Sequence, residues 1–251
     1  MSTDSLTPRL QALQRDSALL LQRAVAEYQD VVYSSSLGIE AMVLTELIFT
    51  YAPEIEIFTL DTGRLPPETL DLLDRVEHRY QQRITVFYPT AESVEAYVRD
   101  NGINGFYLGL AERQACCGVR KVEPFMRAIK GRKAWVTGVR REQSAERANN
   151  ESLAWDERYH MWKVSPILEW TEADIHDYVK AKALPYNALH DQGYPSIGCA
   201  PCTRAVEPGA DPRSGRWWWE NPETRECGLQ PRTRVIPIKP IPINPVKTTA
   251  S

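Results

Sequence analysis

The feature that most restricts the fold is an alternation of short β-rich runs with helical apolar patterns. The helical patterns cover residues 39–52 and 66–81, where proline stands at the start of the second. The β-rich runs before, between and after them cover residues 30–36, 54–63, 83–89 and 133–140. This order is typical of a parallel sheet, because parallel strands need a crossover helix between them. We therefore expect an α/β fold with an open, mostly parallel sheet and helices on both faces.

The flanking segments extend this pattern. Residues 1–28 have the pattern of an amphipathic helix, and residues 161–168 are a candidate further strand. Residues 171–183 predict a helix with Thr171 as its N-cap. Beyond Leu184 the periodicity fades while glycine and proline become frequent, and four prolines fall within residues 237–245. We expect two parts, an α/β domain with an N-terminal helix over residues 1–185 and an irregular C-terminal segment over residues 186–251.

Charge and hydropathy indicate the compartment in which we expect the protein and the partners that we do not expect. The 251 residues carry a net charge of -3, which gives no sign of a nucleic-acid partner. No apolar run approaches the roughly 20 residues that cross a bilayer, and the N-terminus lacks the pattern of a signal peptide. We therefore expect a cytoplasmic protein without a membrane partner. Structural disulfides are rare in that compartment, so clustered cysteines there indicate metal binding or catalysis.

Four of the five cysteines form two tight pairs. Cys199 and Cys202 have the spacing common in metal sites, whereas Cys116 and Cys117 are adjacent. Adjacent residues on a regular element point in different directions, so the set favours a four-iron cluster over a single zinc ion. The fifth, Cys227, stands among charged and flexible neighbours, which indicates an accessible thiol whose pKa nearby cations would lower.

Three polar loops follow predicted strands, where an open parallel sheet binds its ligands. Residues 34–40 (SSSLGIE) offer hydroxyls, a glycine and a helix N-terminus to a phosphate or sulfate, although the loop matches neither common phosphate-loop motif. Thr62 and Arg64 follow the second strand, and Arg140 and Arg141 follow the fourth. Each loop has an ordinary alternative as a turn, a helix cap or a solvated face.

The motifs together resemble those of the assimilatory adenylyl-sulfate reductases, the cluster-bearing branch of the phosphoadenylyl/adenylyl-sulfate reductase family. The resemblance spans residues 34–229 and rests on these segments in order: SSSLGIE, LDTGRLPPET, CCGVRKVEPF, GVRREQS, GCAPCTR, GRWWWE and ECGL. It implies a Rossmann-like sheet of the adenine nucleotide alpha hydrolase type, with residues 1–185 as the nucleotide-binding domain. It also implies a cytoplasmic oxidoreductase of sulfate assimilation and cysteine biosynthesis.

The resemblance implies a reaction and its residues. Cys227 would attack the sulfur of adenosine 5′-phosphosulfate, release AMP and form a thiosulfonate, from which thioredoxin or a glutaredoxin-like dithiol protein would free sulfite. A [4Fe-4S] cluster would be held by Cys116, Cys117, Cys199 and Cys202. We expect it to position Lys121 and tune the local field without changing its oxidation state. We also expect a homo-oligomer. The substrate would be bound by Ser34, Ser35, Ser36, Gly38, Thr62, Arg64, Lys121, Arg140, Arg141, Arg213 and Arg216.

The sequence departs from the family motif at one position, and several alternative functions remain open. Gln230 stands where the family motif usually has histidine, and glutamine cannot titrate near neutrality, so we assign it no catalytic role. The tryptophans 217–219 favour a core or subunit contact over a base-stacking platform. A reductase of the 3′-phosphorylated substrate, or of both substrates, is the nearest alternative. A tRNA-thiolation enzyme that splits ATP and a non-catalytic iron–sulfur protein are more distant ones.

Overall fold

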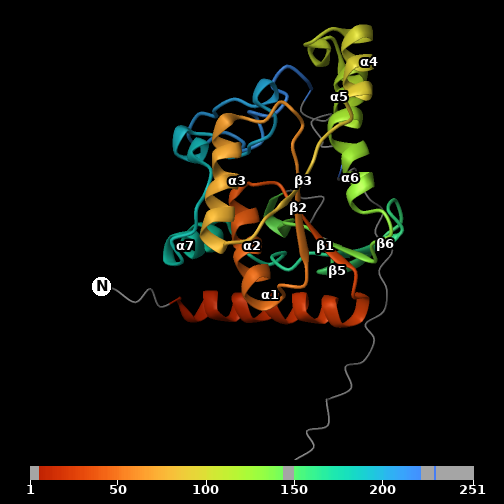
Figure 1. Cartoon of the computed structure of the whole chain (residues 1–251). Helices are drawn as coiled ribbons and strands as arrows, with labels where there is room; N and C mark the ends of the chain where they lie inside the picture. Colours follow the sequence, from red (N-terminus) through yellow and green to blue (C-terminus); the bar gives the residue numbers. More distant parts are fainter. Residues whose placement is uncertain (1–5, 144–149, 222–228, 230–251) are drawn as a thin grey trace, which may run out of the picture.

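The chain folds around one six-stranded sheet with the strand order β3-β2-β1-β4-β6-β5. The structure is a computed structural model, and it describes residues 6–143, 150–221 and 229. Five strands are parallel, and β5 pairs antiparallel with β6 at one edge (Figure 1). The strands are β1 (Val31–Ser35), β2 (Glu56–Leu60), β3 (Thr85–Phe87), β4 (Ala134–Val136), β5 (Leu153–Asp156) and β6 (Met161–Val164). The predicted open, mostly parallel sheet is confirmed, and β5 is the strand that the periodicity did not indicate.

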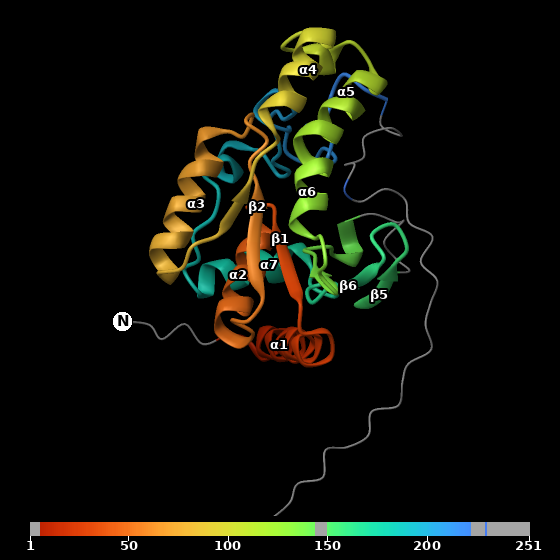
Figure 2. The same ribbon diagram turned by 45° about the vertical axis from the view of Figure 1, so that its right-hand side comes forward.

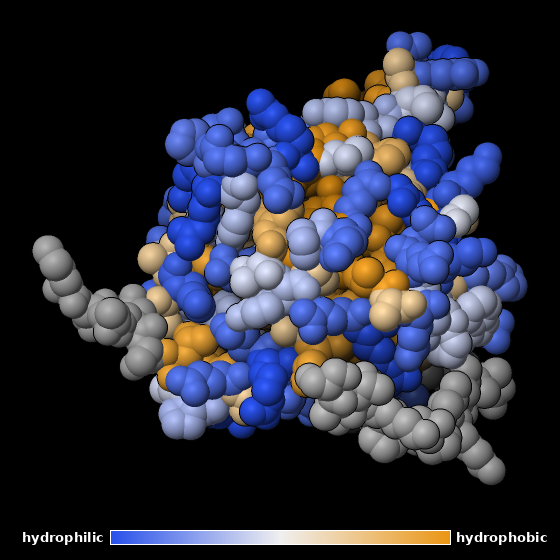
Figure 3. Space-filling view, turned by 60° about the horizontal axis from the view of Figure 1, so that its bottom comes forward, coloured by the Kyte–Doolittle hydropathy of each residue, from blue (hydrophilic) through white to orange (hydrophobic). Residues whose placement is uncertain are grey.

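The two faces of the sheet are covered unequally. One face carries α1 (Pro8–Tyr28), α2 (Ile39–Tyr51), α3 (Pro67–Tyr80) and α7 (Glu172–Ala181), and its packing forms the larger apolar core. The other face is covered by α6 (Glu123–Ala128), whose Phe125 packs against Val32, Phe58 and Trp135. Figures 1 and 2 show α1 lying across one end of the sheet. Figure 3, turned toward that end, shows hydrophilic residues interspersed with hydrophobic ones.

A long helical column joins β3 to β4 and was not foreseen from the sequence. It contains α4 (Ala91–Asn101) and a continuous run of α5 (Leu110–Cys117), a π-helical turn (Gly118–Val122) and α6. In Figure 2 this column rises beyond the sheet. A π-helical turn inside an α-helix is rare and often marks a functional site. Here it follows the two adjacent cysteines directly.

The C-terminal segment has little regular structure over residues 186–221. It contains short 3-10 turns at Ala188–Gln192 and Ala200–Cys202 and a single bridge between Thr203 and Arg216. Of the three tryptophans, Trp217 is buried, in agreement with the expected core role. The boundary at residue 185 stays a prediction. Within the described residues, none of the helices has the length and apolarity needed to cross a membrane.

Asp174 connects α7 to α1, and the contribution of its charge to the stability of the fold can be tested. Thr171 and Asp174 form a capping box at the start of α7, and Arg9 of α1 donates two hydrogen bonds of 2.7 Å to the Asp174 carboxylate. The hydrogen bonds from Arg9, with those from Thr171, hold the pKa of Asp174 well below its usual range. The charged form therefore stabilises the fold above the unfolded pKa of about 3.9, and this stabilisation is lost as the pH falls below it.

We expect Asp174→Asn to lower the stability at pH 7 by roughly 1–2 kcal/mol, the usual size of a capping loss. That corresponds to a fall in Tm of a few degrees, measured by thermal denaturation followed by circular dichroism. The difference from the parent protein should shrink below about pH 4. Asp16→Asn is the matched control, because Asp16 forms an exposed pair with Arg15 and should change little. A difference that stays constant from pH 7 to pH 3 would contradict a role for the charge.

Candidate functional site

A polar hollow lies where the strand order reverses. The sheet continues from β1 to β2 and β3 in one direction and to β4, β6 and β5 in the other, so β1 and β4 flank the switch point. The hollow encloses about 1750 Å³ out to its open mouth. Its lining includes Ser36 and Gly38 after β1, Arg140 after β4, and residues 206–213 of the C-terminal segment. Open α/β sheets bind ligands at this place.

The loop after β1 presents backbone donors to this hollow. Ser35 and Ser36 each accept a backbone hydrogen bond at 3.4 Å, from Leu37 and Gly38 respectively. Leu37 has a positive φ of 55°, an uncommon backbone conformation for leucine, and Gly38 is the N-cap of α2 without a side-chain cap. The first turn of α2, whose N–H groups have no partner within the helix, borders the hollow at Gly38, Ile39 and Glu40. Of the three predicted serines, Ser36 lines it, whereas Ser34 and Ser35 lie in β1, where Ser35 is buried.

The two adjacent arginines point to different places. Arg140 is buried in the lining, where it pairs with Glu40 and Glu142 at 3.1 Å each. Arg141 lies outside the lining, where it pairs with Glu169 and donates to the Asn150 carbonyl at 2.9 Å. Arg213 of the C-terminal segment also lines the hollow. The structure therefore brings Arg140 and Arg213 to the hollow and leaves Arg141 outside it.

A histidine in the lining was missed from the sequence. His190 belongs to the 3-10 turn Ala188–Gln192, and its Nε2 is buried without a hydrogen-bond partner in the described part of the chain. Burial lowers the pKa of His190, which favours the neutral ring. His176 lines the same hollow. A lone histidine in an irregular segment carries no local signal, so only the fold could reveal this position.

The four paired cysteines converge on a second, smaller cavity. Cys116, Cys117, Cys199 and Cys202 all line it, together with Arg64, Lys121 and Phe106. No three His, Cys, Asp or Glu side chains among the described residues are arranged to hold a metal ion. The thiols therefore share a cavity without converging on a single point. Cys227 lies outside the described residues.

Two local features bring the two pairs of cysteines to the same cavity. The adjacent cysteines end α5, and the π-helical turn that follows carries Lys121 to the same cavity. Cys199 lies 3.2 Å from the Thr62 hydroxyl, and its neighbour Ala200 donates a backbone hydrogen bond of 2.8 Å to the Arg64 carbonyl. The loop after β2, which we expected beside the nucleotide, therefore lies against the cysteine cavity.

Buried cations surround the thiols. Arg113 is buried, forms a two-bond pair with Glu220 at 2.8 and 2.9 Å, and stacks over Trp217. Arg120 donates to the Thr62 carbonyl at 2.6 Å. Neither arginine was foreseen, because a charged residue within a helical pattern ordinarily indicates an exposed face.

Arg216 links the cavity to the larger hollow. It is buried against Trp217 and lies close to Ser196 and the Ile197 carbonyl, at 3.4 and 3.3 Å. Ser196 and Ile197 line the large hollow, and Cys199 lies two residues further along. Burial raises the pKa of Cys202 to about 12, and Arg216 partly offsets this rise. The two cavities are thus neighbours through one short segment.

An open parallel sheet with a polar, arginine-bearing hollow at its switch point defines the class of Rossmann-like nucleotide-binding proteins. A family model described as a phosphoadenosine phosphosulfate reductase domain matches residues 30–205. The chain therefore belongs to the phosphoadenosine phosphosulfate and adenosine 5′-phosphosulfate reductase family, as the motifs predicted.

The relatives support this placement. The chain is 49% identical to an adenosine 5′-phosphosulfate reductase of Allochromatium vinosum over 92% of this chain and 89% of that protein. It is 48% identical to one of Neisseria meningitidis over 83% and 85% of the two chains. A solved phosphoadenylyl-sulfate reductase of Candida auris in a phosphate complex matches with a TM-score of 0.66 and 26% identity, covering 80% and 98%. A Candida glabrata FMN adenylyltransferase, at 17% identity and a TM-score of 0.57 over 97% and 82%, shares the fold alone.

Proposed function

We propose that this protein reduces adenosine 5′-phosphosulfate to sulfite and AMP, with electrons from a protein dithiol. The observation that carries the proposal is the hollow at the switch point, where the N-terminus of α2, Arg140 and Arg213 surround one space. Backbone N–H groups and arginine side chains together suit a phosphosulfate, which is doubly anionic. Relatives with this activity in their names, at nearly half identity over most of the chain, support the same conclusion.

The chemistry begins with the fifth cysteine. The Cys227 thiolate forms a bond to the substrate sulfur as the bond from sulfur to the bridging phosphate oxygen breaks, and AMP leaves with that electron pair. The product on the protein is a thiosulfonate. Cations that face the leaving phosphate, with Arg140 and Arg213 as candidates, offset the charge that develops there.

The second step regenerates the thiol. One sulfur of a reduced thioredoxin or a glutaredoxin-like protein attacks the Cys227 sulfur, and sulfite leaves with the electron pair of the S–S bond. The resulting mixed disulfide is resolved by the second thiol of the partner, which is thereby oxidised to a disulfide. The two electrons come from the dithiol. A reducing compartment such as the cytoplasm supplies such a partner.

The residues of the small cavity support an iron–sulfur cluster. Four thiols line it, and Arg64, Arg113, Arg120 and Lys121 line the same space. A cluster held by four thiolates is anionic, so these cations suit it. We propose that Cys116, Cys117, Cys199 and Cys202 hold a [4Fe-4S] cluster, which supplies a fixed electrostatic field. Lys121 would lie between the cluster and the substrate.

The charge of the hollow favours the substrate without a 3′-phosphate. Glu40, Glu142 and Glu172 also line it, and Glu40 and Glu142 are already paired with Arg140. A further phosphate would bring more negative charge to this wall. We expect turnover on adenosine 5′-phosphosulfate with thioredoxin to exceed turnover on the 3′-phosphorylated substrate. Equal turnover on the two would favour a dual-specificity enzyme, and no sulfite from either would overturn the proposal.

The two adjacent arginines provide a matched pair of variants. We expect Arg140→Ala to raise KM for adenosine 5′-phosphosulfate roughly 10-fold to 100-fold, because a hydrogen bond to a charged group contributes about 1.5–3 kcal/mol. Arg141→Ala should leave KM nearly unchanged, since Arg141 pairs with Glu169 outside the hollow. Steady-state sulfite release measures both, with circular dichroism to check the fold. Equal effects of the two substitutions would mean that the hollow does not hold the substrate.

A further inference from the structure

A third hollow lies at the opposite end of the strands that flank the candidate active site. It is bounded by Gln29 before β1, Lys133 before β4 and His160 before β6, all at the amino ends of their strands. The end of α1, the start of the α6–β4 turn and the β5–β6 hairpin form its walls, around about 1380 Å³ out to its open mouth. The reaction proposed above uses none of these residues.

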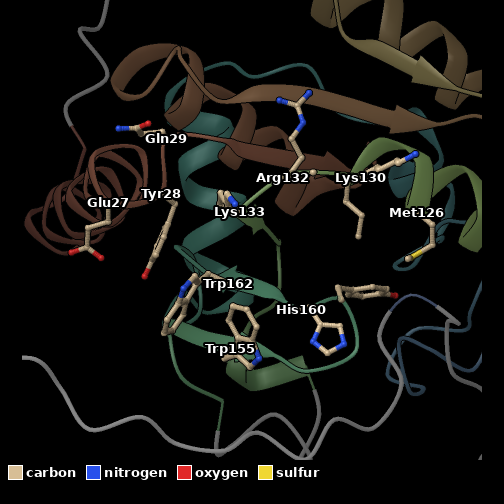
Figure 4. Close-up of a pocket in the computed structure, with 13 residues that line it drawn as sticks. Glu27, Tyr28, Gln29, Met126, Lys130, Arg132, Lys133, Trp155, His160 and Trp162 are labelled. Carbon is tan, nitrogen blue, oxygen red and sulfur yellow. The ribbon is translucent and has the colours of Figure 1, made fainter.

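One wall of this hollow is aromatic. Trp162 stacks on Tyr28 with ring centroids 5.4 Å apart and meets Trp155 edge to face at 5.7 Å. All three rings are only partly buried, and Tyr159 completes the wall. In Figure 4 Trp155, Trp162 and His160 lie on the side of the hollow opposite Lys130 and Arg132. A partly exposed indole offers a planar surface for stacking by another aromatic ring.

The other wall is cationic. Lys130, Arg132 and Lys133 line it, and Glu27 is the acidic residue of the lining. Glu27 is paired with Arg23 at 2.6 Å, and Arg132 is paired with Glu56. Lys130 and Lys133 are exposed, and neither forms an ion pair within the described chain. Two lysines therefore give this hollow a local positive charge in a protein whose net charge is -3.

The aromatic wall and the two lysines together indicate the class of ligand that this hollow could bind. A flat apolar surface and two uncompensated ammonium groups on facing walls match a molecule that carries an aromatic ring at one end and phosphates at the other. The hollow is concave and is built from three separate segments, which suits a small molecule.

We propose that this hollow binds a nucleotide, with its base against Trp155 and Trp162 and its phosphates on Lys130 and Lys133. This second site is separate from the substrate hollow, because the two lie at opposite ends of β1 and β4. None of the four paired cysteines lines this hollow. The proposal therefore stands or falls independently of the reaction proposed above.

Photolabelling with 8-azidoadenosine triphosphate on the full-length protein tests the site. We expect peptide mapping to find label within residues 155–162, in addition to any label in the substrate hollow. Lys130→Ala/Lys133→Ala should weaken labelling at residues 155–162 roughly tenfold, because it removes the charge-assisted contacts to phosphate. Lys180→Ala/Lys182→Ala, on and just after α7, is the matched control and should leave it unchanged. KM for adenosine 5′-phosphosulfate should be the same in all three proteins.

One competition experiment and one pair of substitutions decide the ligand class. Unlabelled ATP should protect residues 155–162 at lower concentration than tripolyphosphate does, because only ATP can use the aromatic wall. Trp155→Phe keeps a ring and should retain labelling better than Trp155→Ala. Label confined to the substrate hollow, or label at residues 155–162 that the lysine substitutions do not reduce, would overturn the proposal. Equal protection by tripolyphosphate would also overturn it, since the hollow would then bind only anions.

Discussion

Cys202→Ser should yield a protein that contains almost no iron and produces no sulfite. Cys202 is the most deeply buried of the four paired cysteines, and it packs with Phe106 and Trp217. Serine has nearly the same shape, so the substitution removes a soft thiolate ligand without opening a large cavity. A four-iron cluster with three remaining thiolates and a buried hydroxyl should be lost during purification. Iron analysis and the visible absorbance of the purified protein measure the result.

The same substitution tests whether the buried cations depend on the anionic cluster as a counter-charge. Without the anionic cluster, Arg113 keeps Glu220 as a partner, but the buried Arg120 would face a cavity of neutral thiols. We therefore expect Cys202→Ser to lower Tm as well as iron content, because buried charges without a counter-charge are costly. Full iron content with unchanged Tm in Cys202→Ser would contradict the proposed ligand set. Zinc in place of iron in the parent protein would contradict the proposed cluster.

Cys227→Ser should differ from Cys202→Ser in keeping a normal iron content, while its sulfite release should also fall, by a factor on the order of a thousand or more. The hydroxyl of serine is a far weaker nucleophile than a thiolate near neutral pH. Substrate binding should persist, because Arg140 and Arg213 in the lining of the hollow at the switch point are unchanged. Equilibrium dialysis with adenosine 5′-phosphosulfate measures binding, and anaerobic sulfite assays measure turnover.

Mass spectrometry identifies the intermediate directly. The parent protein, mixed with substrate in the absence of any dithiol, should gain one SO3 group on the peptide that carries Cys227. Reduced thioredoxin should then remove it. Cys227→Ser should gain none. An adduct on one of the paired cysteines, or undiminished sulfite production by Cys227→Ser, would assign the nucleophile elsewhere.

The order of strands and helices could be predicted because its signals are local. Apolar alternation around Tyr33, Phe58 and Trp135 indicates buried strands, and the proline at the start of α3 and Thr171 before α7 indicate helix starts. The short strand β5 was missed, since four residues at a sheet edge become a strand only through pairing with β6. The helical column from α4 to α6 was also missed, and with it the π-helical turn after the paired cysteines.

The sequence by itself determined the parallel sheet, the family, and which four of the five cysteines form pairs, because residue type and spacing carry that information. The tertiary structure alone decided which of two adjacent arginines lines the hollow and that Thr62 lies against Cys199. It also decided that Arg113 and Arg120 are buried beside the thiols, and that Lys130 and Lys133 face an aromatic wall. Neighbouring side chains diverge and distant segments meet, so these contacts depend on packing between elements that no local pattern encodes.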